Sequence, residues 1–177
     1  VTQEITVDGT TAELPSGDLS SLTITPPENF DGSFDLSVTA TSTEGDALGD
    51  TATTTGSITV DVAAVADEAE LTLGDVGGTE DQAISLNIGV TADDDISNVT
   101  ISGIPEGASL NSGALVSTDP ETGEQTWTVD AADVGGLSLT PAADSDEDFT
   151  LGVSATTTDG ADSATVSGTM DVSVAAD

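Results

Sequence analysis

Every charged side chain in this sequence is acidic. The 177 residues include 34 Asp and Glu and no Lys, Arg or His, which gives a formal net charge of −34 at pH 7. Nucleic acids and anionic membrane surfaces are bound through basic side chains, so neither partner is expected. The lack of His, Cys and Lys also removes the usual activated nucleophiles and soft-metal ligands, and no enzymatic activity is expected. What remains is a chain of carboxylates whose natural counterpart is a cation.

The hydrophobic pattern predicts an all-β fold. Ser and Thr alternate with Val, Leu and Ile over short stretches, which is the pattern of half-buried strands, and no window keeps a helical period. Gly, Pro and Asp separate these stretches at intervals of about 10 residues, as in antiparallel β-sandwiches. No apolar run reaches the ~18 residues of a membrane span, so direct membrane insertion is not expected. The predicted strands include residues 34–40, 58–62, 71–73, 84–90, 99–101, 127–129, 137–139, 149–153 and 170–174.

The second part of the chain repeats the first. The run LTITP at 22–26 matches LSLTP at 137–141, and at the same offset Phe34 corresponds to Phe149. Further along, GSITV at 56–60 matches GTMDV at 168–172, and upstream ITV at 5–7 matches WTV at 127–129. Residues 67–177 therefore form one complete sandwich, whereas residues 1–66 correspond only to the C-terminal part of such a unit. A half sandwich exposes the inner face of its sheet, and its first strands are either removed or supplied elsewhere in the parent chain.

Several short motifs, in their order along the chain, resemble a known family. The run AAVAD at 63–67 marks the junction between the two copies, and TED stands at 79–81 ahead of a strand. Three acids at 93–95 precede VTISGIPEGA at 99–108, and WTV follows at 127–129. Together these motifs resemble the tandem cadherin-like or immunoglobulin-like repeats of giant bacterial adhesins of the RTX type. The likeness covers essentially the whole chain, but ISN at 96–98 replaces the Gly-Ser-Glu that usually continues the second acidic run.

The resemblance implies antiparallel Ig-like or cadherin-like β-sandwiches in tandem. It also implies a calcium-stiffened rod that holds adhesive domains away from the bacterial cell surface. Members of the family are exported by type I secretion and contribute to cell adhesion and biofilm formation. We therefore expect an extracellular, monomeric extender whose partners are calcium ions and the neighbouring repeats of its own chain.

The alternating direction of successive strands, here called strand parity, predicts where the acidic loops lie. They gather at the two ends of the complete unit, here called its poles. In a tandem array the first strand starts at one end of the sandwich and the last strand finishes at the other. The loop at 92–97 and the final hairpin at 158–163 then lie at the N-terminal pole, beside the linker. Loops at 74–81 and 142–148 lie at the C-terminal pole, where Asp177 would be the linker ligand.

Carboxylates at these poles are the candidate metal ligands. Ca²⁺ takes six to eight oxygen ligands, which carboxylates, carbonyls and Asn side chains supply without His or Cys. At the N-terminal pole the candidates are Asp67, Glu68, Asp93, Asp94, Asp95 and Asp159, with Asp31 from the preceding half unit. At the C-terminal pole they are Glu80, Asp81, Asp144, Asp146 and Asp148. Solvated turns are the competing interpretation of both acidic runs, and Trp127 is interpreted as a core anchor.

Two other functions are compatible with the sequence. A halophile-type envelope protein would use its acidic surface for hydration and solubility rather than for binding a metal. A module that recognises glycan or protein would need an apolar or aromatic loop patch, for which Phe30 is the visible candidate.

Overall fold

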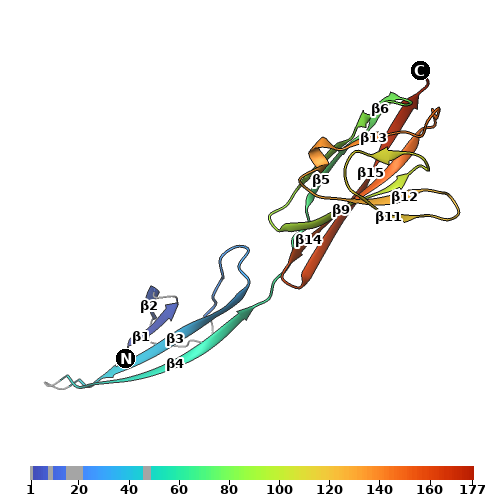
Figure 1. Cartoon of the computed structure of the whole chain (residues 1–177). Helices are drawn as coiled ribbons and strands as arrows, with labels where there is room; N and C mark the ends of the chain where they lie inside the picture. Colours follow the sequence, from blue (N-terminus) through green and yellow to red (C-terminus); the bar gives the residue numbers. More distant parts are fainter. Residues whose placement is uncertain (1, 8–9, 15–21, 46–48) are drawn as a thin grey trace. The chain divides into compact units, whose positions relative to one another are not determined.

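The chain consists of two compact units. The computed structural model describes residues 2–7, 10–14, 22–45 and 49–177, and before residue 22 it describes the backbone alone. The contacts divide the chain into unit 1, Val1–Ala64, and unit 2, Val65–Asp177 (Figure 1). The sequence placed this boundary after residue 66, so the observed division lies two residues earlier, within the AAVAD junction.

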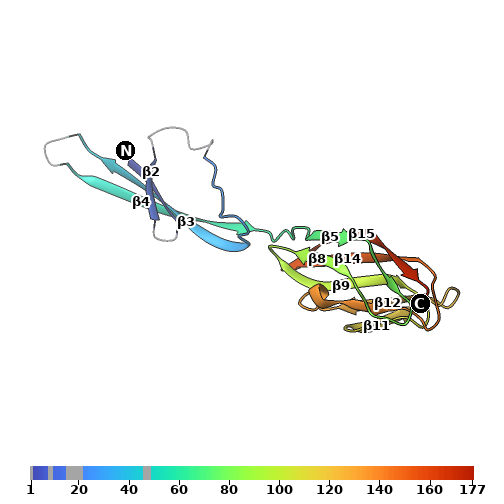
Figure 2. The ribbon, with the colours of Figure 1, turned by 90° about the horizontal axis from the view of Figure 1, so that it is seen from above.

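Unit 2 is an antiparallel β-sandwich, which confirms the predicted fold class. One layer is a six-stranded sheet with the order β11-β12-β9-β14-β15-β6, and the other is formed by a three-stranded sheet, β10-β13-β7, and the pair β5-β8 (Figures 1 and 2). The one parallel pair in this unit joins β15 to β6. The strands are β5 (Glu70–Gly74), β6 (Val76–Thr79), β7 (Ile84–Ser85), β8 (Asn87–Thr91), β9 (Asp95–Ile104), β10 (Ser109–Leu110), β11 (Ala114–Thr118), β12 (Gln125–Val129), β13 (Ser138–Thr140), β14 (Phe149–Asp159) and β15 (Asp162–Ala175), and a short 3-10 helix covers Val134–Gly136.

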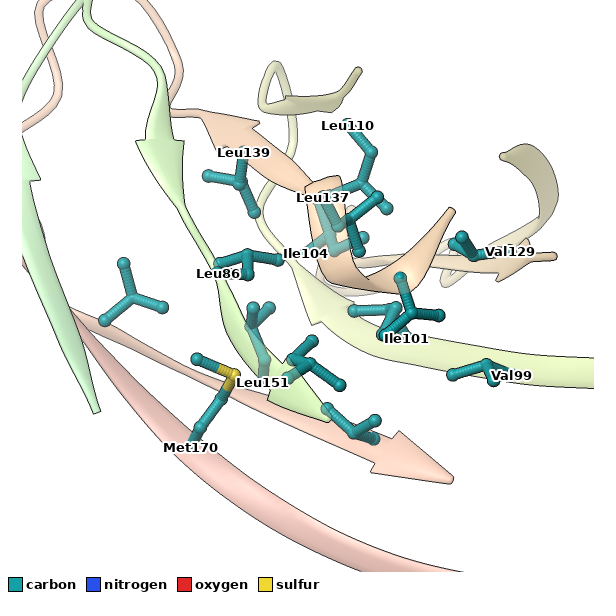
Figure 3. Close-up of a cluster of buried hydrophobic side chains, with 14 of the residues drawn as sticks. Leu86, Val99, Ile101, Ile104, Leu110, Val129, Leu137, Leu139, Leu151 and Met170 are labelled. Atoms are coloured by element: carbon teal, nitrogen blue, oxygen red, sulfur yellow. The ribbon is translucent and has the colours of Figure 1, made fainter. Parts of the chain in front are cut away.

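The hydrophobic core of unit 2 lies between these layers. Leu151 and Met170 project from the long β14–β15 hairpin, and Ile101 comes from the neighbouring strand β9 (Figure 3). Leu137 and Leu139 face them from the opposite layer, and all five side chains are buried. Trp127 is only partly buried and packs against the margin of this core, so it is less central than the sequence suggested.

Two segments of unit 2 differ from their predicted form. Residues 84–90, predicted as one strand, divide into β7, which pairs with β13, and β8, which pairs with β5. The division falls at Leu86, whose N–H donates to the carbonyl of Leu137. Residues 74–81, predicted as a loop, contain strand β6, whose Gly77 and Gly78 carry no alternating side chains from which a strand could be predicted.

Unit 1 is a single four-stranded antiparallel sheet. Its strands are β1 (Thr2–Val7), β2 (Thr10–Leu14), β3 (Gly32–Thr43) and β4 (Thr51–Val62), in the order β2-β1-β3-β4. In the described residues of this unit no second layer covers the sheet.

The β3–β4 hairpin of unit 1 has the same register as the β14–β15 hairpin of unit 2. Leu36 pairs with Ile58, and their counterparts Leu151 and Met170 pair with each other. The preceding turn is also the same, because the N–H of Phe30 donates to Pro27 as that of Ser145 donates to Ala142. Asn29 and Asp144, at equivalent positions in this turn, both have φ of 55°. Asn and Asp are the non-glycine residues that adopt this left-handed conformation most readily.

Candidate functional site

The N-terminal pole of unit 2 ties the entering chain to two acidic loops. The carboxylate of Asp94 accepts a 2.6 Å hydrogen bond from the N–H of Asp67, and that of Asp162 accepts one of 3.1 Å from Ala66. The carbonyl of Asp67 accepts a 2.6 Å bond from the hydroxyl of Thr157, which is buried. The structure thus brings the linker, the loop before β9 and the final hairpin together, as strand parity predicted.

The other candidate ligands at this pole lie around these bonds. Glu68 and Asp93 line one shallow hollow together with Glu70. Asp95 begins strand β9 and pairs with Thr158, so the loop at 92–97 is shorter than predicted. Asp159 ends β14 and pairs with Asp162 across the final turn.

The C-terminal pole is built in the same way. The carboxylate of Glu80 accepts a 3.1 Å hydrogen bond from the N–H of Asp177, where the described chain leaves the sandwich. Asp148 accepts a 2.8 Å bond from the N–H of Val174, and Asp81 accepts a longer one, 3.4 Å, from Asp144. Asp146 is exposed and contributes no hydrogen bond to the described part of the chain.

The carboxylates at both poles therefore act mainly as acceptors for backbone N–H groups. Within the described ranges, no group of three or more acidic side chains is placed to hold a metal ion. Asp31 belongs to unit 1, where it is exposed beside the turn at Phe30. The sequence contains no basic side chain, so N–H and hydroxyl groups are the donors that a carboxylate finds within the protein.

Other acidic residues with this role, among them Asp162 and Asp75, were not among the predicted site residues. Asp162 accepts from Ala66 at the N-terminal pole, and Asp75 accepts a 2.9 Å bond from the N–H of Asp171. The only signal in the sequence is that each of these two acids lies in a predicted loop or hairpin between strands, where Asp commonly accepts backbone hydrogen bonds.

One of these bonds gives a direct prediction of stability. Asp148→Ala is expected to lower the free energy of unfolding by about 1–3 kcal/mol, because the N–H of the buried residue Val174 loses its acceptor. Asp146→Ala removes the same negative charge from the same exposed loop and should change it by less than about 0.5 kcal/mol. Urea unfolding followed by Trp127 fluorescence measures the free energy of unfolding of both variants. Equal losses for the two variants would contradict a capping role.

Asp119 shows what such bonds do to a carboxyl group. It accepts hydrogen bonds from the N–H of Glu121 at 2.7 Å and of Thr122 at 3.1 Å. These bonds, that from Glu121 first, hold the pKa of the Asp119 carboxyl below its ordinary value. Because the pKa is lowered on folding, the stabilisation is present at neutral pH and is lost as the pH falls through the pKa of the folded state.

The titration of this side chain can be followed directly. Carboxyl carbon NMR should give a midpoint for Asp119 below the value of about 3.9 found in unfolded peptides. The Thr122→Pro variant, which lacks one of the donating N–H groups, should move the midpoint upward. An ordinary midpoint in the unmodified chain would show that the turn does not hold these bonds in solution.

Comparisons with known proteins leave the assignment of function to the structure and the sequence. No protein-family model matches this chain, and no curated protein matches it. In the part of the chain that the structure describes, no helix is long and apolar enough to cross a membrane.

The arrangement has a mechanical consequence for unit 2. The linker is held at one pole and Asp177 at the other, and strand β14 spans the distance between them with its eleven residues, about 34 Å. Near the C-terminal pole β15 pairs in parallel with β6, from Val172↔Val76 to Ala175↔Thr79. A pull on the two ends of unit 2 would load these backbone hydrogen bonds together, in shear.

Proposed function

We propose that this chain is a stretch of calcium-binding extender repeats from a bacterial cell-surface adhesin, exported by type I secretion. In this role the repeats project adhesive domains for cell adhesion and biofilm formation. The proposal is supported by the resemblance of the junction and loop motifs to such repeats. It is also supported by the internal repeat and by the absence of the groups that ordinary catalysis needs.

The observation that carries the spacer role is the placement of the two ends of unit 2 at opposite poles, each end fastened by a carboxylate. Tandem repeats connected in this way transmit tension from pole to pole through each sandwich. The parallel β6–β15 pair lies on that route. Pulling on the chain is therefore the direct test of this role.

Calcium binding is proposed because carboxylates gather at each pole of unit 2. In the described residues no three carboxylates are placed to hold one ion together, so the residues do not fit a preformed, high-affinity site. Glu68 and Asp93, which share a hollow, are the pair that an ion from solution meets most directly. A site of this kind belongs with weak extracellular modules, whose Kd values are around 10⁻⁴ to 10⁻³ M.

Calorimetry on the full chain tests the calcium part. At 10 mM Ca²⁺ a site with such a Kd adds about 1.4–2.7 kcal/mol, which raises the Tm of a unit of this size by roughly 5–10 °C over EDTA. NaCl at equal ionic strength should have a much smaller effect. Glu68→Gln combined with Asp93→Asn should reduce the shift, whereas Glu121→Gln with Glu124→Gln should leave it intact. An identical Tm in Ca²⁺ and in EDTA would refute calcium binding.

A halophile-type acidic envelope protein is the second candidate. It is favoured by the finding that acidic side chains are spread over exposed positions and form no group of three in the described residues. If the chain has that function, about molar NaCl or KCl should raise the Tm to its maximum, because the salt screens the repulsion between the negative charges. Ca²⁺ should then raise the Tm no further. The same calorimetric series, extended to high salt, distinguishes the two candidates.

A further inference from the structure

Unit 1 exposes side chains whose counterparts in unit 2 are buried. Leu22 is 47% exposed, whereas Leu137 at the equivalent position is 1% exposed. Ile24 is 42% exposed against 0% for Leu139, and Ile58 is 56% exposed against 1% for Met170. The two units share the hairpin register and the preceding turn, so the difference lies in what covers them and not in the local fold.

In unit 2 the covering layer comes from the first part of the repeat. Strand β13, which carries Leu139, is flanked by β7 and β10, and Ile84 pairs directly with Leu139. Ile84, Leu86 and Ile88 complete the same core as Leu151 and Met170. In unit 1 the segment equivalent to β13, residues 22–26, forms no strand, because the described part of that unit has no counterparts of β7 and β10 to pair with it.

The order of strands in the sheet of unit 1 also differs from that in unit 2, because the strand equivalent to β9 is missing from the described part of unit 1. Residues 5–7 of β1 match residues 127–129 of β12 in sequence. In unit 2, β9 lies between β12 and β14, whereas in unit 1 β1 pairs directly with β3. The pair Ile5↔Val38 thus stands where unit 2 has Ile101↔Val153, so β1 occupies the position of the β9 equivalent.

The uncovered face ends in an apolar hollow. Ile24, Pro26, Pro27, Phe30 and Phe34 line it, and the rings of Phe30 and Phe34 meet edge to face at 5.8 Å. In unit 2 the equivalent of Ile24 lies on β13, which is paired on its two sides with β7 and β10. Phe30, the residue considered for glycan or protein recognition, therefore belongs to the edge of an incomplete core.

We infer that the apolar face of unit 1 is a docking surface for a polypeptide segment of the type seen in residues 67–122 of this chain, supplied by another repeat of the same kind. This segment adds a β9-type strand at the edge of β3 and displaces β1 outward by one position. It also covers Leu36 and Ile58 with a β7–β8-type layer, in which the segment that carries Ile24 pairs as β13 does in unit 2. The inference rests on the internal repeat and holds whether or not the spacer function proposed above is correct.

A fusion provides the test. A second copy of residues 67–122 is joined directly before residue 1 of the full chain, which reproduces the spacing between β12 and its upstream strands in unit 2. Hydrogen exchange followed by mass spectrometry then compares peptides from β4 of unit 1 and β15 of unit 2. Amides of residues 51–62 should exchange at least about tenfold more slowly in the fusion than in the unmodified chain, because they become part of a closed sandwich.

Two variants make the test specific for docking. Replacing Ile84, Leu86 and Ile88 by Asp in the added copy alone should abolish the protection. Ile58→Asp should leave exchange in the unmodified chain unchanged, since this side chain is exposed there, but it should remove the protection in the fusion.

Two results would overturn the inference. One is an exchange rate for residues 51–62 that the added segment does not change, with β15 serving as the internal standard for a folded unit. The other is an unmodified chain that sediments as a dimer and already protects residues 51–62 as well as β15. In that case a second copy of the chain, and not a donated segment, would cover the face.

Discussion

Replacing Leu137 by Ala is expected to destabilise unit 2 by about 2–5 kcal/mol, because the substitution removes buried methyl groups and leaves a cavity that close packing does not refill. Leu137 is buried in the layer that closes the sandwich and belongs to the same core as Leu110 and Ile104 (Figure 3). A loss of this size is a large part of the 5–15 kcal/mol that stabilises a typical domain. Urea unfolding followed by the fluorescence of Trp127, the single Trp of the chain, reports on unit 2.

The matched control is Leu22→Ala. It makes the same chemical change at the equivalent position of the repeat, but Leu22 is exposed, so the expected cost is below about 0.5 kcal/mol. Circular dichroism of the full chain detects the loss of structure in either unit. If Leu22→Ala proved as costly as Leu137→Ala, unit 1 would possess a closed core of its own and the half-repeat interpretation would be wrong.

The second large effect is mechanical. Ser173→Pro is expected to lower the force needed to unfold unit 2 by roughly half, because forced unfolding is governed by the barrier and the β6–β15 pair resists it first. Val174 donates its N–H to Asp148, so by strand alternation the N–H of Ser173 points towards β6. Proline removes that donor, while the side chain at this position is already exposed.

The control for this variant is Ala176→Pro, which introduces the same residue just beyond the end of β15. It removes no hydrogen bond between β6 and β15 and should leave the unfolding force nearly unchanged. Leu137→Ala, although costly at equilibrium, should lower the force less than Ser173→Pro does, because it leaves the parallel pair intact. Force spectroscopy measures the unfolding force of the three variants. If these forces followed the order of equilibrium stability, the β6–β15 pair would not be the element that resists the pull first.

Much of the fold could be predicted from the sequence because strand alternation is a local property. Residues 34–40 lie within β3 and residues 149–153 and 170–174 within the long hairpin of unit 2, as predicted. The two poles were also predicted, since chain direction alone places loops at one end or the other. Strand β6 escaped prediction because its pairing with β15 joins residues almost a hundred positions apart, and two of its four residues are Gly.

The chemistry of the poles was harder to predict than their location. A sequence shows that Asp94, Asp148 and Glu80 lie near the ends of the sandwich, but it does not show where their carboxylates point. In the structure each one accepts a hydrogen bond from a backbone N–H. With no basic side chain to compete, these amides are among the few donors available to the carboxylates.

Whether unit 2 transmits tension between its poles can be tested by changing the direction of pulling. The chain contains no Cys, so attachment points can be introduced at exposed residues in pairs. Val65→Cys with Asp177→Cys pulls from pole to pole and loads the parallel pair in shear. Val116→Cys with Asp177→Cys pulls from β11, at the opposite edge of the six-stranded sheet, and breaks hydrogen bonds one after another. We predict an unfolding force roughly twice as high for the first pair as for the second, although both proteins have the same equilibrium stability. Equal forces, or a weaker response along the pole-to-pole direction, would contradict the spacer function.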